Sequence, residues 1–319
     1  MTGFAYHRPS SLDDALAALA ERGSLPIGGG SDLLAAVEEG RTAPTRVVEL
    51  EHIPELATIT VQSDGGVRIG AGVRIASLAE APELAAFPVL RAACSAVGSP
   101  ALRAMGTLGG NLGQRQRCWY FRSGVGCFKN GGTGCAAVDG EHVYHAILAS
   151  GTCHAAHPSD PAVALLALDA RVEVRSIRGS RMLDIAALYE GAADNARSET
   201  VLAKDEVIVA VHLGAAARDG AQHWEKLTQR RAFDLALVSC AGVRHTDGSV
   251  RIALGGVAAG PWRAPHSVEE DIASGGLDDE SIEALAARAM YDATPLAGNA
   301  YKVQMAEAAI RRAARAISI

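Results

Sequence analysis

The sequence lacks an excess of basic residues. Among its 319 residues, 30 lysines and arginines stand against 36 acidic residues, which gives a formal net charge of -6. Because nucleic acids and anionic membranes attract proteins with a basic surplus, we expect neither as a partner. The apolar runs, such as 161–168, are also far shorter than the ~18 residues that a membrane span requires. We therefore expect no insertion into a membrane.

The N-terminus lacks the basic patch and following apolar run of a secretory signal. We therefore expect synthesis into a reducing compartment, where disulfides are rare. A chain of 319 residues also has enough core to fold without disulfide staples. The clustering of four of the six cysteines then indicates metal or redox chemistry.

The patterns that are present predict an α+β chain of about two domains, with the boundary near residue 218. Residues 1–55 alternate strands and helices, with Ser11 as the cap of the first helix. A hairpin around the turn 63–66 opens the next lobe. The other elements that we expect are a helix over 83–97, antiparallel strands over 224–227, 236–244 and 250–257, and helices over 280–291 and 301–317.

A glycine loop that opens a helix is the first candidate binding motif. It consists of Ile27, Gly28, Gly29, Gly30, Ser31, Asp32 and Leu33. Glycines let backbone N–H groups approach an anion. The loop is not a P-loop, because no Gly-Lys-Ser/Thr follows, and it lacks the third glycine of the dinucleotide fingerprint. A tight turn without a ligand is the alternative interpretation.

A second loop, Thr107-Leu108-Gly109-Gly110-Asn111, has the same character, and Ser159-Asp160 is a third polar element. Taken singly, a Gly-Gly pair marks many ordinary loops. Together the three elements are suited to an extended ligand with a pyrophosphate at one end and a ring system at the other. Lys226 alternates with apolar neighbours on an expected strand, which would point it into a cleft; ordinary surface charge is the alternative.

Four cysteines, Cys118, Cys127, Cys135 and Cys153, are spaced Cys-x8-Cys-x7-Cys-x17-Cys. Disulfides would suit an exported protein. Zinc sites usually show ligand pairs about two to four residues apart, and none occurs here. Wide, irregular spacing suits an iron–sulfur cluster held by a wrapped loop, with Arg115, Arg117, Arg122 and Lys129 offsetting its charge. Cys94 and Cys240 fall in a helix and a strand and are expected in the core.

Together these motifs resemble the FAD-binding (medium) subunit of the xanthine dehydrogenase and molybdenum hydroxylase family. Most such subunits have only a short link between the Gly-Gly-Asn motif and the Ser-Asp pair, whereas 47 residues separate Asn111 from Ser159 here. This excess resembles the insertion that binds a [4Fe-4S] cluster in the flavin subunits of periplasmic aldehyde oxidoreductase and of 4-hydroxybenzoyl-CoA reductase. Residues 117–121, 134–137 and 153–160 look most like the aldehyde oxidoreductase type.

The resemblance implies a two-lobed FAD-binding domain of the PCMH/vanillyl-alcohol-oxidase type over residues 1–218. Its lobes would cover 1–55 and 56–218, with the iron–sulfur insertion at 114–157, which we call the cysteine segment. Residues 219–319 would form an α/β domain like the C-terminal domain of CO dehydrogenase flavoproteins, with a three-stranded antiparallel sheet.

The resemblance also implies roles for the site residues. The glycine loop would hold the FAD pyrophosphate, while Thr107, Gly110 and Asn111 would lie along the flavin and its phosphates. Asp160 would bind polar groups of FAD, Ile208 would pack on the ring, and Lys226 would approach it from the second domain. The four cysteines of the segment would ligate the cluster, and no residue is assigned a catalytic role.

Asp32 departs from the family, whose flavin loop often has asparagine there. A carboxylate repels pyrophosphate, so we expect Asp32 to cap the following helix instead.

The implied function is that of an enzyme subunit in a molybdenum-dependent aldehyde oxidoreductase. A molybdopterin-binding large subunit and a [2Fe-2S] small subunit would complete a heterotrimer, and FAD would pass electrons to an external acceptor. The complex would be cytoplasmic, or periplasmic by co-export with a signal-bearing partner. A stand-alone FAD-dependent reductase and a non-catalytic zinc-stabilised assembly module are the alternatives.

Overall fold

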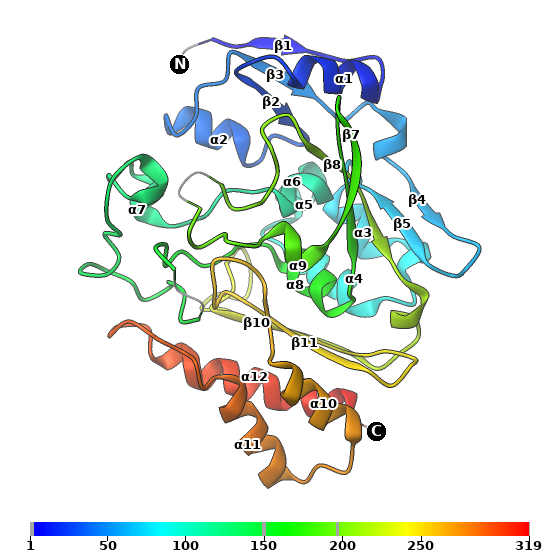
Figure 1. The fold of residues 1–319 in the computed structure, drawn as a ribbon, viewed down its shortest axis with the longest axis vertical. Coiled ribbons are helices and arrows are strands. Elements are labelled where there is room, and N and C mark those ends of the chain that lie inside the picture. The colour runs from blue at the N-terminus through cyan, green and yellow to red at the C-terminus, as the bar shows by residue number, and fades with distance from the viewer. Residues whose placement is uncertain (1–2, 149–150, 196–197, 319) are drawn as a thin grey trace.

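The computed structural model describes residues 3–148, 151–195 and 198–318. Within these residues the chain forms three sheets, which Figure 1 shows in order from the N-terminal lobe to the C-terminal helices. Helices flank each sheet, which confirms the predicted α+β class with two lobes and a C-terminal domain.

The first lobe is a parallel sheet of order β1–β3–β2 with helix α1 packed against it. Its elements are β1 (Ala5–His7), α1 (Leu12–Leu19), β2 (Ser24–Ile27), α2 (Leu33–Glu38) and β3 (Arg46–Glu49). Ser11 caps α1 as predicted, because its Oγ accepts a hydrogen bond from the backbone N–H of Asp14 at 3.1 Å. Leu12 and Leu16, one helical turn apart, share a buried core with Val48.

The second lobe is an antiparallel sheet of order β4–β5–β8–β6–β7. Its strands are β4 (Ile59–Val61), β5 (Val67–Gly70), β6 (Arg171–Ser176), β7 (Gly179–Asp184) and β8 (Val207–Leu213). Its helices are α3 (Ile75–Glu80), α4 (Pro88–Ser95), α5 (Pro100–Met105), α6 (Leu108–Leu112), α8 (Asp160–Ala167) and α9 (Ile185–Leu188). The predicted hairpin is β4–β5. The helix expected over 83–97 begins only at Pro88, which is favoured at a first helical position.

The C-terminal domain is an antiparallel sheet with helices on both faces. Its elements are β9 (Gln222–Leu227), β10 (Val238–Arg244), β11 (Val250–Gly255), β12 (Trp262–Arg263), α10 (His266–Ser274), α11 (Asp279–Ala289) and α12 (Tyr301–Ile317). The three predicted strands are confirmed, and the two-residue β12 adds a fourth at the edge. Neither β12 nor α10 was predicted; the two residues of β12 are too short to show a period.

The C-terminal sheet also joins the domains, because its two faces belong to different cores. Helices α4 and α8 of the second lobe pack on one face and α12 on the other, and Figure 1 shows β10 and β11 between these layers. Along β10, Ala241 and Val243 belong to the core shared with the second lobe, while Cys240 lies in the core under α12. Cys94 is buried in α4. Both predictions of core cysteines are therefore confirmed.

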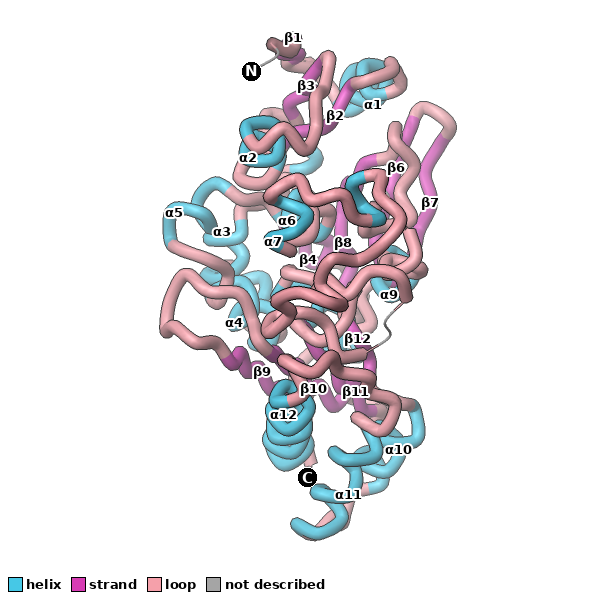
Figure 2. Tube along the Cα trace, turned by 90° about the vertical axis from the view of Figure 1, so that its left-hand side faces the viewer, coloured by secondary structure: helices cyan, strands magenta, loops and turns pink. Residues whose placement is uncertain are grey.

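The cysteine segment, residues 114–157, carries little regular structure. Helix α7 (Trp119–Arg122) and a 3-10 turn at Phe128–Asn130 are its helical parts, and Figure 2 shows most of its described residues as loop. This agrees with its weak periodicity in the sequence.

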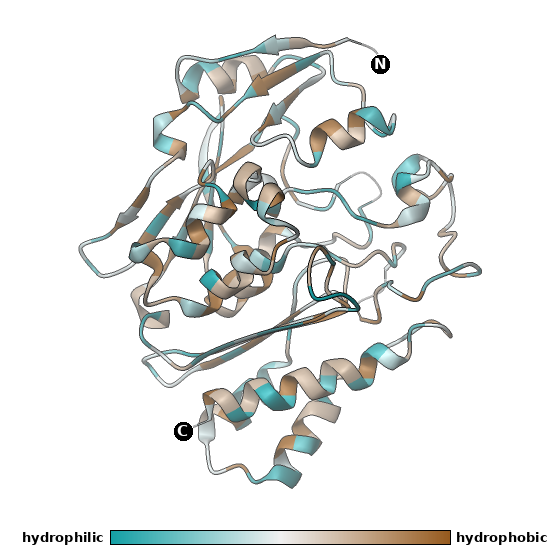
Figure 3. Ribbon diagram, turned by 180° about the vertical axis from the view of Figure 1, so that it is seen from behind, coloured by the Kyte–Doolittle hydropathy of each residue, from teal (hydrophilic) through white to brown (hydrophobic). Residues whose placement is uncertain are grey.

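Among the described residues, no helix is both long and apolar enough to cross a membrane. The longest helix named above, α12, carries hydrophobic and hydrophilic stretches in turn along its length (Figure 3).

Candidate functional site

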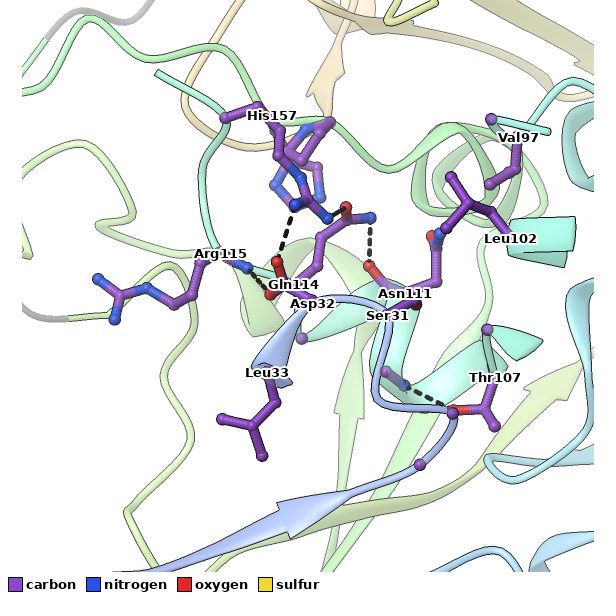
Figure 4. A pocket seen from close by; sticks show the side chains of 18 of the residues that line it. Ser31, Asp32, Leu33, Val97, Leu102, Thr107, Asn111, Gln114, Arg115 and His157 are labelled. Carbon is purple, nitrogen blue, oxygen red and sulfur yellow. Dashed lines mark hydrogen bonds and ion pairs between the residues drawn. The ribbon is translucent and has the colours of Figure 1, made fainter. Parts of the chain in front are cut away.

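A cavity of about 980 Å³ lies where the two lobes and the C-terminal domain meet (Figure 4). Its volume falls within the range of about 300–1,000 Å³ that is usual for small-molecule and cofactor sites. All thirteen residues predicted for FAD line it: Ile27, Gly28, Gly29, Gly30, Ser31, Asp32, Leu33, Thr107, Gly110, Asn111, Asp160, Ile208 and Lys226. The structure thus brings the three sequence motifs and the strand lysine to one place.

The glycine loop follows β2 and packs against the loop that precedes α6. A Cβ on Gly28 would lie 2.5 Å from Thr107 Oγ1, and a Cβ on Gly29 would collide with the backbone carbonyl of Met105. Gly30 has a φ of +71°, which disfavours other residues. The glycines are therefore needed for the two loops to approach each other as well as for an open cavity wall.

Asp32 does not cap α2, so this prediction was wrong. It stands at the N-cap position, but its carboxylate makes no capping hydrogen bond. Its Oδ1 instead accepts a hydrogen bond from Arg122 Nη2 at 2.7 Å and forms an ion pair with Arg117 Nη1 at 2.9 Å. Its Oδ2 accepts from the backbone N–H of Arg115 at 2.8 Å. Both carboxylate oxygens are therefore occupied by donors outside the helix, and the backbone of Asp32 is helical (φ -110°, ψ -50°) rather than extended as at a usual N-cap.

Thr107 and Asn111 hold the second loop in shape. Thr107 caps α6, since its Oγ1 accepts from the backbone N–H of Gly110 at 3.2 Å. Asn111 Oδ1 accepts from Ser159 Oγ at 2.6 Å, and the same Ser159 oxygen accepts from the N–H of Ala162 at the start of α8. The Gly-Gly-Asn motif and the Ser-Asp pair are therefore in direct contact.

Asp160 and Lys226 form a buried ion pair across the domain boundary. Lys226 Nζ lies 2.7 Å from Asp160 Oδ2 and also donates to the carbonyl of Ala96 at 2.9 Å. Burial raises the pKa of Asp160 to about 6, and the neighbouring Lys226 works against that rise. Lys226 thus points into the interior as predicted. Ile208, on β8, is buried and also lines the cavity.

Other polar residues that were not predicted to bind FAD also line the cavity, among them Gln114, Arg115, Arg117 and His157. His157 is buried, and neither of its ring nitrogens has a hydrogen-bond partner among the described residues. Its ring packs edge-on against Tyr189 at 4.6 Å. Burial lowers the pKa of His157 to about 3, so the imidazole is neutral. Only its place three residues before Asp160 could have drawn attention to it.

The four cysteines of the segment line one small, apolar cavity next to the larger one. Cys118, Cys127, Cys135 and Cys153 share it with the side chain of the buried Lys129, and all six cysteines of the chain are free thiols. Burial raises the pKa of the Cys118 thiol and raises that of Cys153 to about 11. The two cavities meet at Cys118, Phe121 and Ala155, which line both.

This arrangement fits a cluster in donor chemistry but is not a closed metal site. Within the described ranges, no three histidine, cysteine or acidic side chains form a group that could hold a metal ion. All four basic residues of this region are paired with carboxylates. Arg115 and Lys129 pair with Glu199, and Arg117 and Arg122 pair with Asp32. The expectation that these basic residues offset thiolate charge stays a prediction. Of the four, Lys129 acts on the Cys153 thiol, whose pKa it lowers against the effect of burial.

The C-terminal domain forms hydrogen bonds with residues 144 and 145 of the cysteine segment. Lys302 of α12 is fully buried and donates to the carbonyls of Tyr144, His145 and Gly256. Asn299 donates to the carbonyl of His145 as well. The ring of His145 lies 3.2 Å from the Cys118 sulfur, measured from its Nε2. The position of Cys118 therefore depends on residues from both domains.

Two family models match the chain in succession. The FAD binding domain in molybdopterin dehydrogenase matches residues 2–215, and the CO dehydrogenase flavoprotein C-terminal domain matches residues 225–317. The chain therefore belongs to the family of FAD-binding medium subunits of the xanthine dehydrogenase and CO dehydrogenase enzymes, and it is a flavoprotein subunit of an oxidoreductase.

Individual relatives agree with this assignment. The chain is 36% identical over 319 residues to the aldehyde oxidoreductase FAD-binding subunit PaoB of Escherichia coli strain K12, covering 96% of both chains. It is 26% identical over 298 residues to the xanthine dehydrogenase FAD-binding subunit of Escherichia coli O157:H7, covering 91% of this chain and 86% of that one. Its structure resembles a chain of carbon monoxide dehydrogenase from Hydrogenophaga pseudoflava with a TM-score of 0.76 at 25% identity, over 98% and 96% of the two chains.

Proposed function

We propose that this chain is the FAD- and [4Fe-4S]-containing electron-transfer subunit of a molybdenum-dependent aldehyde oxidoreductase. The observation that carries the proposal is the convergence of all thirteen predicted residues on one cavity in a chain of this family. Similarity to an aldehyde oxidoreductase subunit over nearly the whole chain favours an aldehyde as the substrate of the complex.

FAD, when bound, supplies the exchange of single electrons and of electron pairs, which is a property of the cofactor. The chain's own residues position it. In this proposal, residues 27–33 hold the pyrophosphate, and Thr107, Gly110 and Asn111 lie along the phosphates and the flavin. Asp160 binds its polar groups, Ile208 packs on the ring, and Lys226 fixes the orientation of Asp160 from the C-terminal domain. No residue acts on the aldehyde, so none is assigned a catalytic role.

The cluster is proposed to be held by Cys118, Cys127, Cys135 and Cys153. A [4Fe-4S] cluster, when bound, exchanges single electrons. The support for it is the cavity that these four thiols share with Lys129. Lys129 also pairs with Glu199, but its charge already lowers the pKa of the Cys153 thiol and would stabilise a thiolate there. Binding must release the thiol protons, because burial raises the pKa of Cys118 and Cys153.

The partners in this proposal are a molybdopterin-binding large subunit and a [2Fe-2S] small subunit in a heterotrimer, with an external electron acceptor. The complex works in the cytoplasm, or in the periplasm after co-export with a signal-bearing partner. We place the boundary between the FAD-binding and C-terminal domains near residue 218, between the matches to the two family models.

Anaerobic purification of the chain, followed by its absorption spectrum and by flavin, iron and sulfide analysis, tests the proposal. We expect one FAD per chain with about four iron and about four sulfide. Flavin without iron would remove the cluster from the proposal. Zinc without flavin would overturn it in favour of an assembly module, and NAD(P)H oxidation by the isolated chain would favour a stand-alone reductase.

A further inference from the structure

The Asp32 carboxylate is the structural link between the glycine loop and the cysteine segment. Both of its oxygens are engaged, Oδ1 by the guanidinium groups of Arg117 and Arg122, and Oδ2 by the backbone N–H of Arg115. Figure 4 shows Asp32 between Arg115 and the glycine-loop residues Ser31 and Leu33. All three donors belong to the cysteine segment. The segment alone therefore holds one side chain of the large cavity, which we call the flavin cavity after its proposed ligand.

The arginines also change the charge that a ligand meets at the loop. An unpaired carboxylate beside a diphosphate raises the free energy of the complex through like-charge repulsion. Here two guanidinium groups contact that carboxylate at 2.9 and 2.7 Å, and the Arg122 side chain is only 12% exposed. Asp32 thus remains compatible with an anionic ligand as long as the arginines stay in place.

The same arginines are fixed to the cysteine cavity. Arg117 immediately precedes Cys118, and Arg122 ends helix α7, which follows it. Arg122 also donates through Nε to the carbonyl of Gln116 at 3.0 Å and through Nη1 to Glu39, just after α2. A shift of Cys118 therefore moves the counter-charges of Asp32.

We propose that Asp32, Arg117 and Arg122 form an ionic latch that couples the order of the cysteine segment to the affinity of the cavity for FAD. The latch rests on the proposed placement of the FAD pyrophosphate at the glycine loop. Coupling between two sites is reciprocal, so a bound dinucleotide also orders residues 115–122.

Three variants distinguish the latch from charges that act independently, because the latch predicts non-additive effects on FAD affinity. Replacing both arginines (R117Q with R122Q) exposes the Asp32 carboxylate to the diphosphate and breaks the tether. Asp32→Asn breaks the ion pairs but adds no repulsion. The triple variant has neither the charge nor the pairs, so it behaves like Asp32→Asn.

FAD affinity, measured by flavin fluorescence on the full chain, decides between these outcomes. We expect the arginine pair variant to bind about tenfold or more weakly than the wild type, because the unpaired Asp32 carboxylate then repels the diphosphate. Asp32→Asn should lose less, and adding it to the arginine variant should recover affinity. Arg171→Gln, which removes an exposed arginine that pairs with Asp184 at 3.7 Å in the second lobe, is the matched control.

Additive losses, or a triple variant as weak as the arginine pair variant, would overturn the latch. Hydrogen exchange gives a second measurement that does not depend on affinity. FAD should slow the exchange of residues 115–122 in the wild type and not in Asp32→Asn, and equal protection in both would also contradict the proposal.

The placement of the pyrophosphate is tested separately by Gly29→Ala, which disturbs the loop without touching the arginines. If Gly29→Ala leaves FAD affinity unchanged, that placement fails. If it weakens binding while the arginine variants do not, only the latch fails.

Discussion

The flavin cavity and the cysteine cavity share a wall but are built in opposite ways. The walls of the flavin cavity contact one another, since Gly29 packs on Met105 and Asp160 pairs with Lys226. The cysteine cavity is lined by thiols in loop segments, and its shape depends on anchors outside it. Most contacts that hold the first cavity lie within its own lining, whereas the second depends on residues that do not line it, namely Asp32, Glu199 and Lys302 of α12.

The largest effect that would sharpen this comparison is expected from Lys226→Met. The substitution leaves the Asp160 carboxylate buried without its partner, which should lower the free energy of unfolding by about 4 kcal/mol. Urea unfolding would measure the loss. Lys204→Met, at an exposed lysine, is the matched control. A loss as small as that of the control would show that the pair does not hold the flavin cavity together.

Lys302→Met should have the next largest effect. It should lower the free energy of unfolding by about 3 kcal/mol, because three carbonyls lose a buried charged donor. The loss should appear as faster hydrogen exchange in residues 142–146, with little change at the glycine loop. An equal increase in exchange at residues 142–146 and at the glycine loop would contradict the view that residues outside the cysteine cavity hold it in place.

Gly29→Ala should cost about 2 kcal/mol, since its Cβ collides with a backbone carbonyl that cannot rotate away. Gly134→Ala, in the cysteine segment, meets nothing within 4 Å and should change stability by less than about 0.5 kcal/mol. Thermal unfolding of the two variants compares a packed position in the flavin cavity with an open position in the cysteine segment. A reversed order would break the comparison.

The smallest effect concerns pH. The pKa of His157 falls from 6.5 to about 3 on folding, so its contribution to stability is complete above pH 6.5 and is lost as the pH falls towards 3. At pH 5.5 the wild type should already have lost about 1.4 kcal/mol through this group. His157→Gln should flatten that part of the stability profile, and a variant with an unchanged acid slope would show that His157 is not buried as a neutral ring.

The lining of the flavin cavity was predictable because its residues stand in short, local motifs. A polar or glycine-containing loop is predicted at each of Gly28 to Gly30, Thr107 and the Ser159-Asp160 pair. The family resemblance then assigned all three to one FAD site. The actual partner of Asp32 was not predictable, because Arg122 lies 90 positions away and nothing local links them. Similarly, nothing in the sequence distinguishes Lys302 from an exposed lysine of a helix. Only the packing of α12 shows that it is fully buried.

The grip of Lys302 on His145 has a consequence for synthesis. The two residues lie 157 positions apart, so the thiols are already exposed on the nascent chain long before their last anchor is translated. In the proposed function, iron delivered during that interval would meet an incomplete site, so we expect the cluster to be loaded only after α12 has been synthesised and packed.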